Sequence, residues 1–211
     1  MPGIGPAQGM SRPPSTPAEP ERPRYTDEAF DGLATSDLDF SGALLLGCTF
    51  TNCELSEASF RGAQLSECRF AGCELTMLDI TDAVFQSVEF ETCRLTGNDF
   101  SSLKLGPMGV MVKFADCDLS FCSFRKMDLT ACAFERCQLL EAEFTRCELE
   151  GVTFAGCDLG RCTFNANNLI EADLRGARNY LISPLGNRIR GLKVELPEAQ
   201  GLLVALEVEL Y

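Results

Sequence analysis

The sequence predicts an all-β solenoid, in which very short strands and turns alternate along one elongated domain. The first observation is a Leu, Phe or Ile that recurs at every fifth position from Phe40 to Leu105, and again from Phe114 to Leu174. The second is that all 12 cysteines lie two residues before one of these positions. A fixed period is the signature of a repeat protein, because each unit can bury its apolar side chains only against its neighbours.

A period of five fits neither a helix nor a long strand, since buried positions recur near every 3.6 residues in a helix and every second residue in a strand. Within each unit the Leu or Phe and the residue two before it are apolar, as in Cys53-Glu54-Leu55. Such a triplet predicts a tiny strand whose outer two side chains point inward. The other two positions often end in Gly or Asn, as at Gly62 and Gly156. Glycine adopts positive φ without a Cβ clash, so these positions predict a turn in every unit.

The units resemble the A(D/N)LXX consensus of the pentapeptide-repeat family, as in Ala-Asp-Leu-Arg-Gly at 172–176 and Cys-Glu-Leu-Ser-Glu at 53–57. The resemblance covers 27 units between residues 36 and 177. It implies a right-handed quadrilateral β-helix with four units per coil. Coils stacked at the usual strand separation of about 4.8 Å would form a rod roughly 32 Å long.

One interruption breaks the repeat, because eight residues separate Leu105 from Phe114 where four are normal. If four of them form a loop, Phe114 stacks over Phe90 and the Phe and Leu columns both stay pure. The alternative is that Val110 is a further core position followed by a one-residue deletion, which would move every later Phe onto a Leu face. We favour a loop within 106–113, since Gly and Pro mark turns. Its tip would be Gly106, Pro107, Met108 and Gly109.

The same phasing stacks six cysteines in one column: Cys53, Cys73, Cys93, Cys117, Cys137 and Cys157. Packing is the favoured interpretation, because a free cysteine behaves as a small buried hydrophobe. Disulfides between coils fit less well, since the rung spacing of about 4.8 Å exceeds the usual Cβ separation of roughly 3.5 to 4.5 Å. A straight ladder without histidine is also a poor tetrahedral site. We therefore expect neither a metal ion nor another cofactor.

The two ends of the chain depart from the repeat. Residues 1–24 hold seven of the ten prolines and no apolar periodicity or signal-peptide stretch, which predicts a disordered tail. Residues 25–35, with Phe30 and Leu33, are expected to cap the first coil. No segment is apolar enough to cross a membrane, and we expect a cytoplasmic protein with reduced cysteines.

The segment 178–211 leaves the five-residue register and predicts a short amphipathic helix with Pro197 as its first residue. The apolar positions of that helix would be Ala199, Leu202, Leu203 and Leu206. The helix could cap the last coil or join two monomers end to end. The ending resembles that of the microcin B and albicidin self-immunity members of the family. Because related members dimerise through their C-terminal ends, the resemblance favours a homodimer.

The surface of the predicted rod is acidic. Residues 36–177 contain 22 Asp and Glu against 11 Lys and Arg, a net charge of −11. This is roughly one negative charge per 3 Å of rod, against one per about 1.7 Å in duplex DNA. The most acidic positions form columns on two adjacent faces: Glu54, Glu74, Asp118 and Asp158 on one, and Asp39, Asp79, Asp99 and Glu143 on the next. The columns could bind a partner, or could simply keep a repeat protein soluble and its strands unpaired.

The chain offers little for catalysis. It lacks histidine and a phosphate-binding glycine motif, and its thiols point into the core. The sign of the charge disfavours direct binding to nucleic acid or to a membrane surface. The resemblance extends to the quinolone-resistance, microcin B and albicidin types of the family. It implies a DNA mimic that binds DNA gyrase or topoisomerase IV and protects the enzyme from a poison. The alternative is a scaffold with no topoisomerase role, since fold alone does not determine function.

Overall fold

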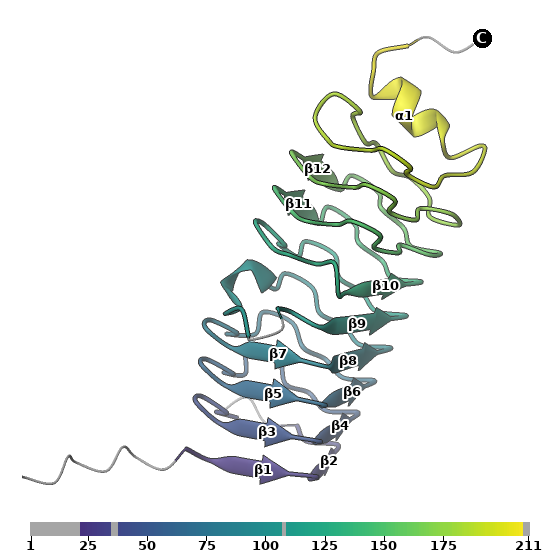
Figure 1. The fold of residues 1–211 in the computed structure, drawn as a ribbon. Helices are drawn as coiled ribbons and strands as arrows, with labels where there is room; N and C mark the ends of the chain where they lie inside the picture. Colours follow the sequence, from purple (N-terminus) through teal and green to yellow (C-terminus); the bar gives the residue numbers. More distant parts are fainter. Residues whose placement is uncertain (1–21, 35–37, 107–108, 209–211) are drawn as a thin grey trace, which may run out of the picture.

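The computed structural model describes residues 22–34, 38–106 and 109–208, and the coils stack into a rod (Figure 1). The strands are three or four residues long, and each pairs in parallel with the strand one coil away. The first sheet contains β1 (Arg24–Thr26), β3 (Leu44–Leu46), β5 (Gln64–Ser66) and β7 (Val84–Gln86). The second contains β2 (Ala29–Asp31), β4 (Thr49–Thr51), β6 (Arg69–Ala71), β8 (Val88–Glu91), β9 (Val112–Ala115) and β10 (Ala133–Glu135). The third contains β11 (Glu143–Thr145) and β12 (Thr163–Asn165).

Each coil has four faces, which we number 1 to 4 and which contain Leu45, Phe50, Leu55 and Phe60 in turn. The first and second sheets form faces 1 and 2, and isolated parallel bridges twenty residues apart continue the ladder on faces 3 and 4. The predicted quadrilateral β-helix is thereby confirmed.

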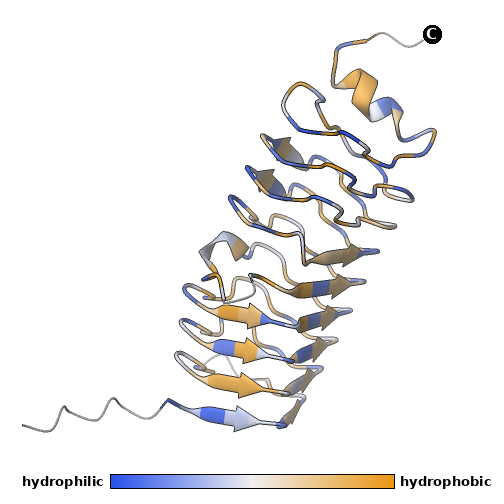
Figure 2. Cartoon of the chain, viewed as in Figure 1, coloured by the Kyte–Doolittle hydropathy of each residue, from blue (hydrophilic) through white to orange (hydrophobic). Residues whose placement is uncertain are grey.

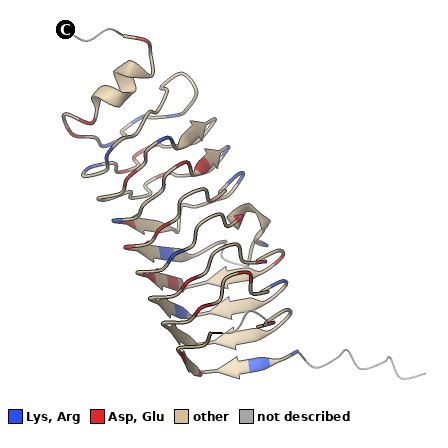
Figure 3. Cartoon of the chain, turned by 180° about the vertical axis from the view of Figure 1, so that it is seen from behind, with Lys and Arg blue, Asp and Glu red and all other residues tan. Residues whose placement is uncertain are grey.

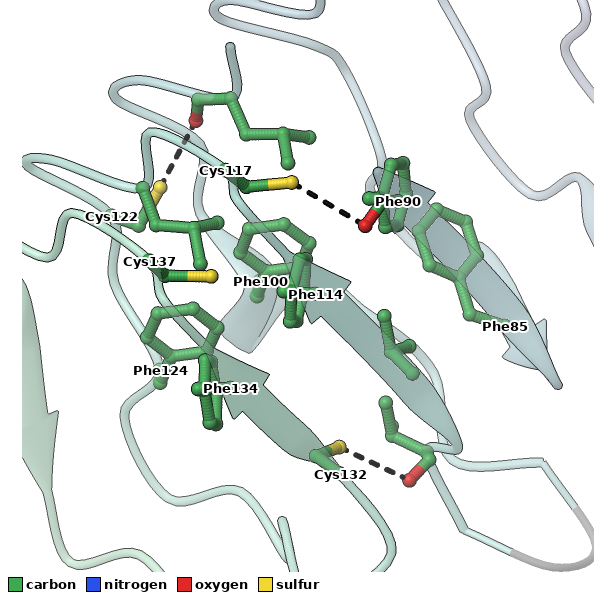
Figure 4. Packing of buried hydrophobic residues seen from close by; sticks show 14 of the residues in the cluster. Phe85, Phe90, Phe100, Phe114, Cys117, Cys122, Phe124, Cys132, Phe134 and Cys137 are labelled. Atoms are coloured by element: carbon green, nitrogen blue, oxygen red, sulfur yellow. Dashed lines mark hydrogen bonds between the residues drawn. The ribbon is translucent and has the colours of Figure 1, made fainter. Parts of the chain in front are cut away.

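Phenylalanines from faces 2 and 4 fill the interior. Within a face the rings stack from coil to coil, with 4.6 Å between the ring centroids of Phe50 and Phe70 and 4.9 Å between those of Phe124 and Phe144. Between the faces they meet edge to face, as Phe124 and Phe134 do at an interplanar angle of 89° (Figure 4). Both arrangements suit the aromatic quadrupole. The predicted alternation of Phe and Leu faces is confirmed with one departure: Phe85 is buried on face 1, where it pairs with Leu65.

The register across the interruption also follows the prediction. Val88 pairs with Val112 and Phe90 with Phe114, a separation of 24 residues where 20 is normal. The Phe column of face 2 therefore continues unbroken across the interruption, from Phe90 through Phe114 to Phe134.

The residues that leave the coil at the interruption differ from those predicted. The side chain of Leu105, an expected core residue, is 62% exposed, whereas that of Val110 is 3% exposed. Met111 donates its N–H to the carbonyl of Phe85, so Val110 takes the core place above that ring. The chain therefore leaves the coil at residue 105 and returns at 110, and residues 110–113 of the predicted loop belong to the coil. Val110 is buried because alternate side chains of an extended segment lie on the same side, so Val110 and Val112 both point inward.

At the end of each unit the chain turns through a residue with left-handed backbone. Gly62 and Gly156 do this as expected, with φ of 65° and 69°. Non-glycine residues occupy the same corner position elsewhere, for example Glu57 (φ 64°) and Lys126 (φ 59°). Each such residue costs roughly 1 kcal/mol or more. The coil enforces the conformation, because the corner N–H bonds to the next coil, as Glu57 N–H does to the Thr76 carbonyl at 2.9 Å.

All twelve cysteines are buried free thiols, as the packing interpretation expects. Several of them also close corners of the preceding coil. The corner from Phe154 to Cys157 is closed directly, by a 3.1 Å bond from the Cys157 N–H to the Phe154 carbonyl. At the corner from Phe134 to Cys137, the Cys157 thiol bridges the two groups instead, since its Sγ accepts the Cys137 N–H at 3.4 Å and donates to the Phe134 carbonyl at 3.5 Å.

Asn98 closes a corner in the same way as this thiol. Its Oδ1 accepts the N–H of Leu78 at 2.7 Å, and its Nδ2 donates to the carbonyl of Leu75 at 2.8 Å. Cysteine and asparagine thus share a role at this inward position, because a buried N–H must find an acceptor. The cysteines therefore fill the core and satisfy its backbone as well.

The N-terminal residues expected to cap the first coil form a coil of their own. Phe30 stacks on Phe50 with 4.6 Å between centroids, and Tyr25 in β1 pairs with Leu45. Residues 1–21 of the predicted tail lie outside the described residues, whereas Arg24 belongs to β1.

At the C-terminal end the ladder continues beyond residue 177, with parallel bridges that reach Arg188 and Lys193. Helix α1 (Gln200–Val204) follows, and it begins three residues after Pro197, its expected first residue, because residues 196–199 form turns instead. The helix rests on the chain at Gly201, where a Cβ atom would collide with the carbonyl oxygen of Tyr180.

Candidate protein-binding surface

The structure places the acidic residues in the two columns that the sequence predicts. On face 3 parallel bridges connect Glu54 to Glu74 and continue through Arg94 to Asp118, and then through Gln138 to Asp158. On face 4 bridges connect Asp39 through Ser59 to Asp79, and Asp99 through Ser123 to Glu143. The two columns run along adjacent faces, and Figure 3 shows acidic residues spread along the rod.

Cations neutralise half of these acids. Within the face 3 column, Arg94 Nε lies 3.7 Å from Glu74 Oε2, and Arg178 Nε lies 3.0 Å from Asp158 Oδ2. On face 4 Arg61 contacts Asp79 at 3.8 Å and Arg125 contacts Glu143 at 3.6 Å. The twenty-residue stacking rule would have revealed Arg94 beside Glu74, because they are twenty positions apart, but the prediction considered acids alone.

The other four acids carry the uncompensated charge of the two columns. Among the residues that the structure describes, Asp39, Glu54, Asp99 and Asp118 form no ion pair. Their charge extends along the N-terminal two thirds of the rod. This stretch is where a positively charged partner would meet the strongest negative potential.

The aspartates are held rigidly because each accepts the N–H of the residue two positions later. Asp39 accepts from Ser41 at 2.8 Å, and Asp118 accepts from Ser120 at 3.0 Å. Hydrogen bonds from the side chain and backbone of Ser41 hold the pKa of Asp39 below its ordinary value, and those from Thr81 do the same for the pKa of Asp79. These carboxylates are therefore ionised and fixed in direction at neutral pH.

A sequence profile described as pentapeptide repeat region matches residues 43–110 and 110–174. The chain belongs to the pentapeptide-repeat family. No curated protein matches it in sequence.

Solved structures of pentapeptide-repeat proteins resemble the fold. A trypsin-treated variant of QnrB1, a plasmid-mediated fluoroquinolone resistance protein, superimposes with a TM-score of 0.75 at 22% identity, covering 90% of this chain and 95% of QnrB1. A second trypsin-treated variant of QnrB1 gives a TM-score of 0.51 at 21% identity, covering 89% and 100%. At this identity the likeness shows a shared fold.

Three of the buried thiols of this pentapeptide-repeat rod are poor nucleophiles. Burial raises the pKa of Cys68 to about 11 and the pKa of Cys122 and Cys162 to about 12. Thiolates at these three positions would be scarce at neutral pH. Within the described ranges, no group of three or more acidic, Cys or His side chains could hold a metal ion, and no helix is long and apolar enough to span a membrane.

Of the predicted loop tip, the structure describes Gly106 and Gly109, and the N–H of Gly109 donates to the carbonyl of Gly106 at 3.1 Å. Pro107 and Met108 lie outside the described residues.

The apolar residues expected to form a dimer contact divide into two groups. Leu202 packs on the core cluster and Ala199 is half-buried, whereas Leu203 and Leu206 are exposed. The C-terminal segment also exposes apolar residues that the prediction did not include: Leu185, Leu196 and Val204. Figure 2 shows α1 largely in the hydrophobic colour. The helix thus covers the last coil with one side and leaves apolar side chains outside.

Proposed function

We propose that this protein is a non-enzymatic DNA mimic that binds bacterial DNA gyrase or topoisomerase IV and protects the enzyme from a topoisomerase poison. The observation that carries the proposal is the pair of acidic columns on adjacent faces, in which hydrogen bonds from the backbone hold the aspartates in place. Four of these carboxylates form no ion pair among the residues that the structure describes. The fold shared with a fluoroquinolone resistance protein supports the same function.

The mechanism is electrostatic competition for the positively charged groove that receives DNA. An acidic rod enters such a groove because the two electrostatic potentials are complementary, and it needs no side chains that imitate individual DNA bases. The net charge of −11 over residues 36–177 is dense enough to attract the groove from a distance. Occupation of the groove disfavours the cleavage complex that the poison traps. Buried free thiols suit the reducing cytoplasm in which such an enzyme works.

The test measures gyrase supercoiling and poison-induced DNA cleavage with and without the protein. Changing Asp79, Asp99, Asp118 and Asp158 together to Asn removes four charges yet keeps an oxygen to accept each backbone N–H. We expect this variant to fold normally and to lose protection, and we expect wild-type binding to weaken as salt rises.

A matched control changes Glu67, Glu89, Glu150 and Glu171, which lie on faces 1 and 2, to Gln. It removes the same charge from the other side of the rod and should keep protection. If wild-type protein at micromolar concentration neither protects nor inhibits gyrase, the proposal fails and a scaffold role remains.

We further propose that two copies join through the C-terminal end. The support is the exposed apolar surface of α1 and the turns around it, where Leu185 and Leu196 are 87% and 80% exposed. Exposed apolar surface of this kind is typical of interfaces. Leu203→Asp should yield monomers in sedimentation velocity, whereas Leu202→Asp should instead unfold the end of the rod. An unchanged sedimentation coefficient for Leu203→Asp would refute the contact.

A further inference from the structure

The corner between faces 3 and 4 forms a continuous ridge along the rod. Each of its residues donates its N–H to a carbonyl of the next coil: Glu57 to Thr76, Met77 to Thr96, Gly97 to Ser120, and Phe121 to Leu140. The corner therefore places Met77, Gly97 and Phe121 on three successive coils. Met77 and Phe121 are two coils apart, or about 10 Å.

These two side chains are unusual for their backbone conformation. Of the 19 non-glycine residues with positive φ in the described structure, Met77 (φ 56°) and Phe121 (φ 63°) are the large apolar ones. The others are charged, polar or alanine. A bulky side chain in the left-handed region is strained, and such strain tends to persist at functional positions.

Packing does not account for the two residues. The side chain of Met77 is 59% exposed and that of Phe121 is 57% exposed, so neither gains much from burial. Gly97 leaves room between them, and Met77 Sδ occupies this space, 2.8 Å from where a Cβ of residue 97 would lie. A thioether, which lies over Gly97, and a phenyl ring are thus exposed on one ridge.

The ridge also lies where the uncompensated charge is greatest. Asp118 precedes Phe121 by three residues on face 3, and Asp99 follows Gly97 by two residues on face 4. Neither carboxylate forms an ion pair within the described residues. The ridge therefore has one unpaired carboxylate on each side, whereas the two carboxylates next to Met77, Glu74 and Asp79, are paired with arginine.

We propose that Met77 and Phe121 are the anchor residues of the protein interface, and that the partner presents an apolar recess bordered by Lys and Arg side chains. This inference rests on the proposed function and names the surface of the partner that the rod recognises. Aromatic and methionine side chains at the centre of a charged patch are typical hot spots, because the surrounding polar groups exclude water from the contact. The free carboxylates select a basic partner, and they oppose a second copy of this chain or a nucleic acid.

The test combines Met77→Asn with Phe121→Asn, because asparagine tolerates left-handed backbone and carries no charge. We expect the double variant to bind gyrase at least about tenfold more weakly than wild type. Its thermal midpoint should be equal or higher, because the strain is relieved. A purely structural role would instead lower the midpoint.

The control combines Thr92→Asn with Ala166→Asn, which makes the same change at left-handed corners elsewhere on the rod. It should bind gyrase as wild type does. The loss in the Met77 and Phe121 variant should also persist at high salt, whereas the loss caused by the Asp→Asn changes should shrink.

Equal binding by the double variant and wild type would overturn the inference and leave the proposed function intact. A change in its sedimentation coefficient would indicate self-association through the ridge and would also overturn it. Failure of the wild-type protein to bind gyrase would remove both proposals together.

Discussion

Cys157→Ala tests whether the buried thiols hold the corners of the coil together. The Cys157 thiol accepts the N–H of Cys137 at 3.4 Å and donates to the carbonyl of Phe134 at 3.5 Å. An alanine methyl group can do neither. The N–H of Cys137 would then stay buried without this acceptor, in a corner that no direct backbone bond closes.

The expected cost follows from these contacts. A buried N–H without a partner costs about 1 to 3 kcal/mol, and loss of the sulfur from a packed core adds about 1 kcal/mol. Cys157→Ala should therefore lower the free energy of unfolding by about 2 to 4 kcal/mol. Cys162→Ala is the matched control on the next face. Its sulfur donates to the Leu139 carbonyl, which the N–H of Ala142 also bonds at 3.0 Å, so only about 1 kcal/mol should be lost.

The assay is urea unfolding under reducing conditions, followed by circular dichroism, together with amide hydrogen exchange. The amide of Cys137 should lose protection in Cys157→Ala and keep it in Cys162→Ala. Cys157→Asn should recover part of the stability, because Asn98 closes an equivalent corner. Equal losses for the two alanine variants, or an unchanged exchange rate at Cys137, would refute the reasoning.

Three further outcomes test other parts of the structure. Arg175 lowers the pKa of Asp173 to about 2, so the stability gained from ionised Asp173 is present above about pH 4 and lost as the pH falls toward 2. Asp173→Asn should lower the free energy of unfolding by about 1 to 2 kcal/mol at pH 7, and approach wild type near pH 2 in urea titrations. Val110→Asp should cost more than about 3 kcal/mol in the same assay, whereas Leu105→Asp should change it by less than about 0.5 kcal/mol. Gly201→Ala should detach α1 from the last coil and expose it to limited proteolysis.

Much of the candidate surface could be predicted because it depends on the repeat alone. The twenty-residue rule, with four extra residues allowed for the interruption, places Glu54, Glu74, Asp118 and Asp158 in one column. The same rule could have found Arg94 beside Glu74. It could not show that Met77 and Phe121 project as a ridge, because their corner positions are Gly, Glu or Arg in other coils and the unit pattern does not prescribe them.

The sequence by itself determined the period, and with the four-sided coil implied by the family resemblance it also determined the faces on which most Phe residues and the acids lie. This is possible because each unit has nearly the same neighbours, so a local pattern repeats along the rod. The tertiary structure alone decided which residue fills the core at the interruption and how open corners are closed. Val110 replaces Leu105 only because the adjoining strand must pair with β8, and Cys157 serves a corner formed twenty residues earlier. Both outcomes depend on contacts between coils. Which side chain is buried, and which group accepts a buried N–H, is decided by the residue that the adjacent coil places there.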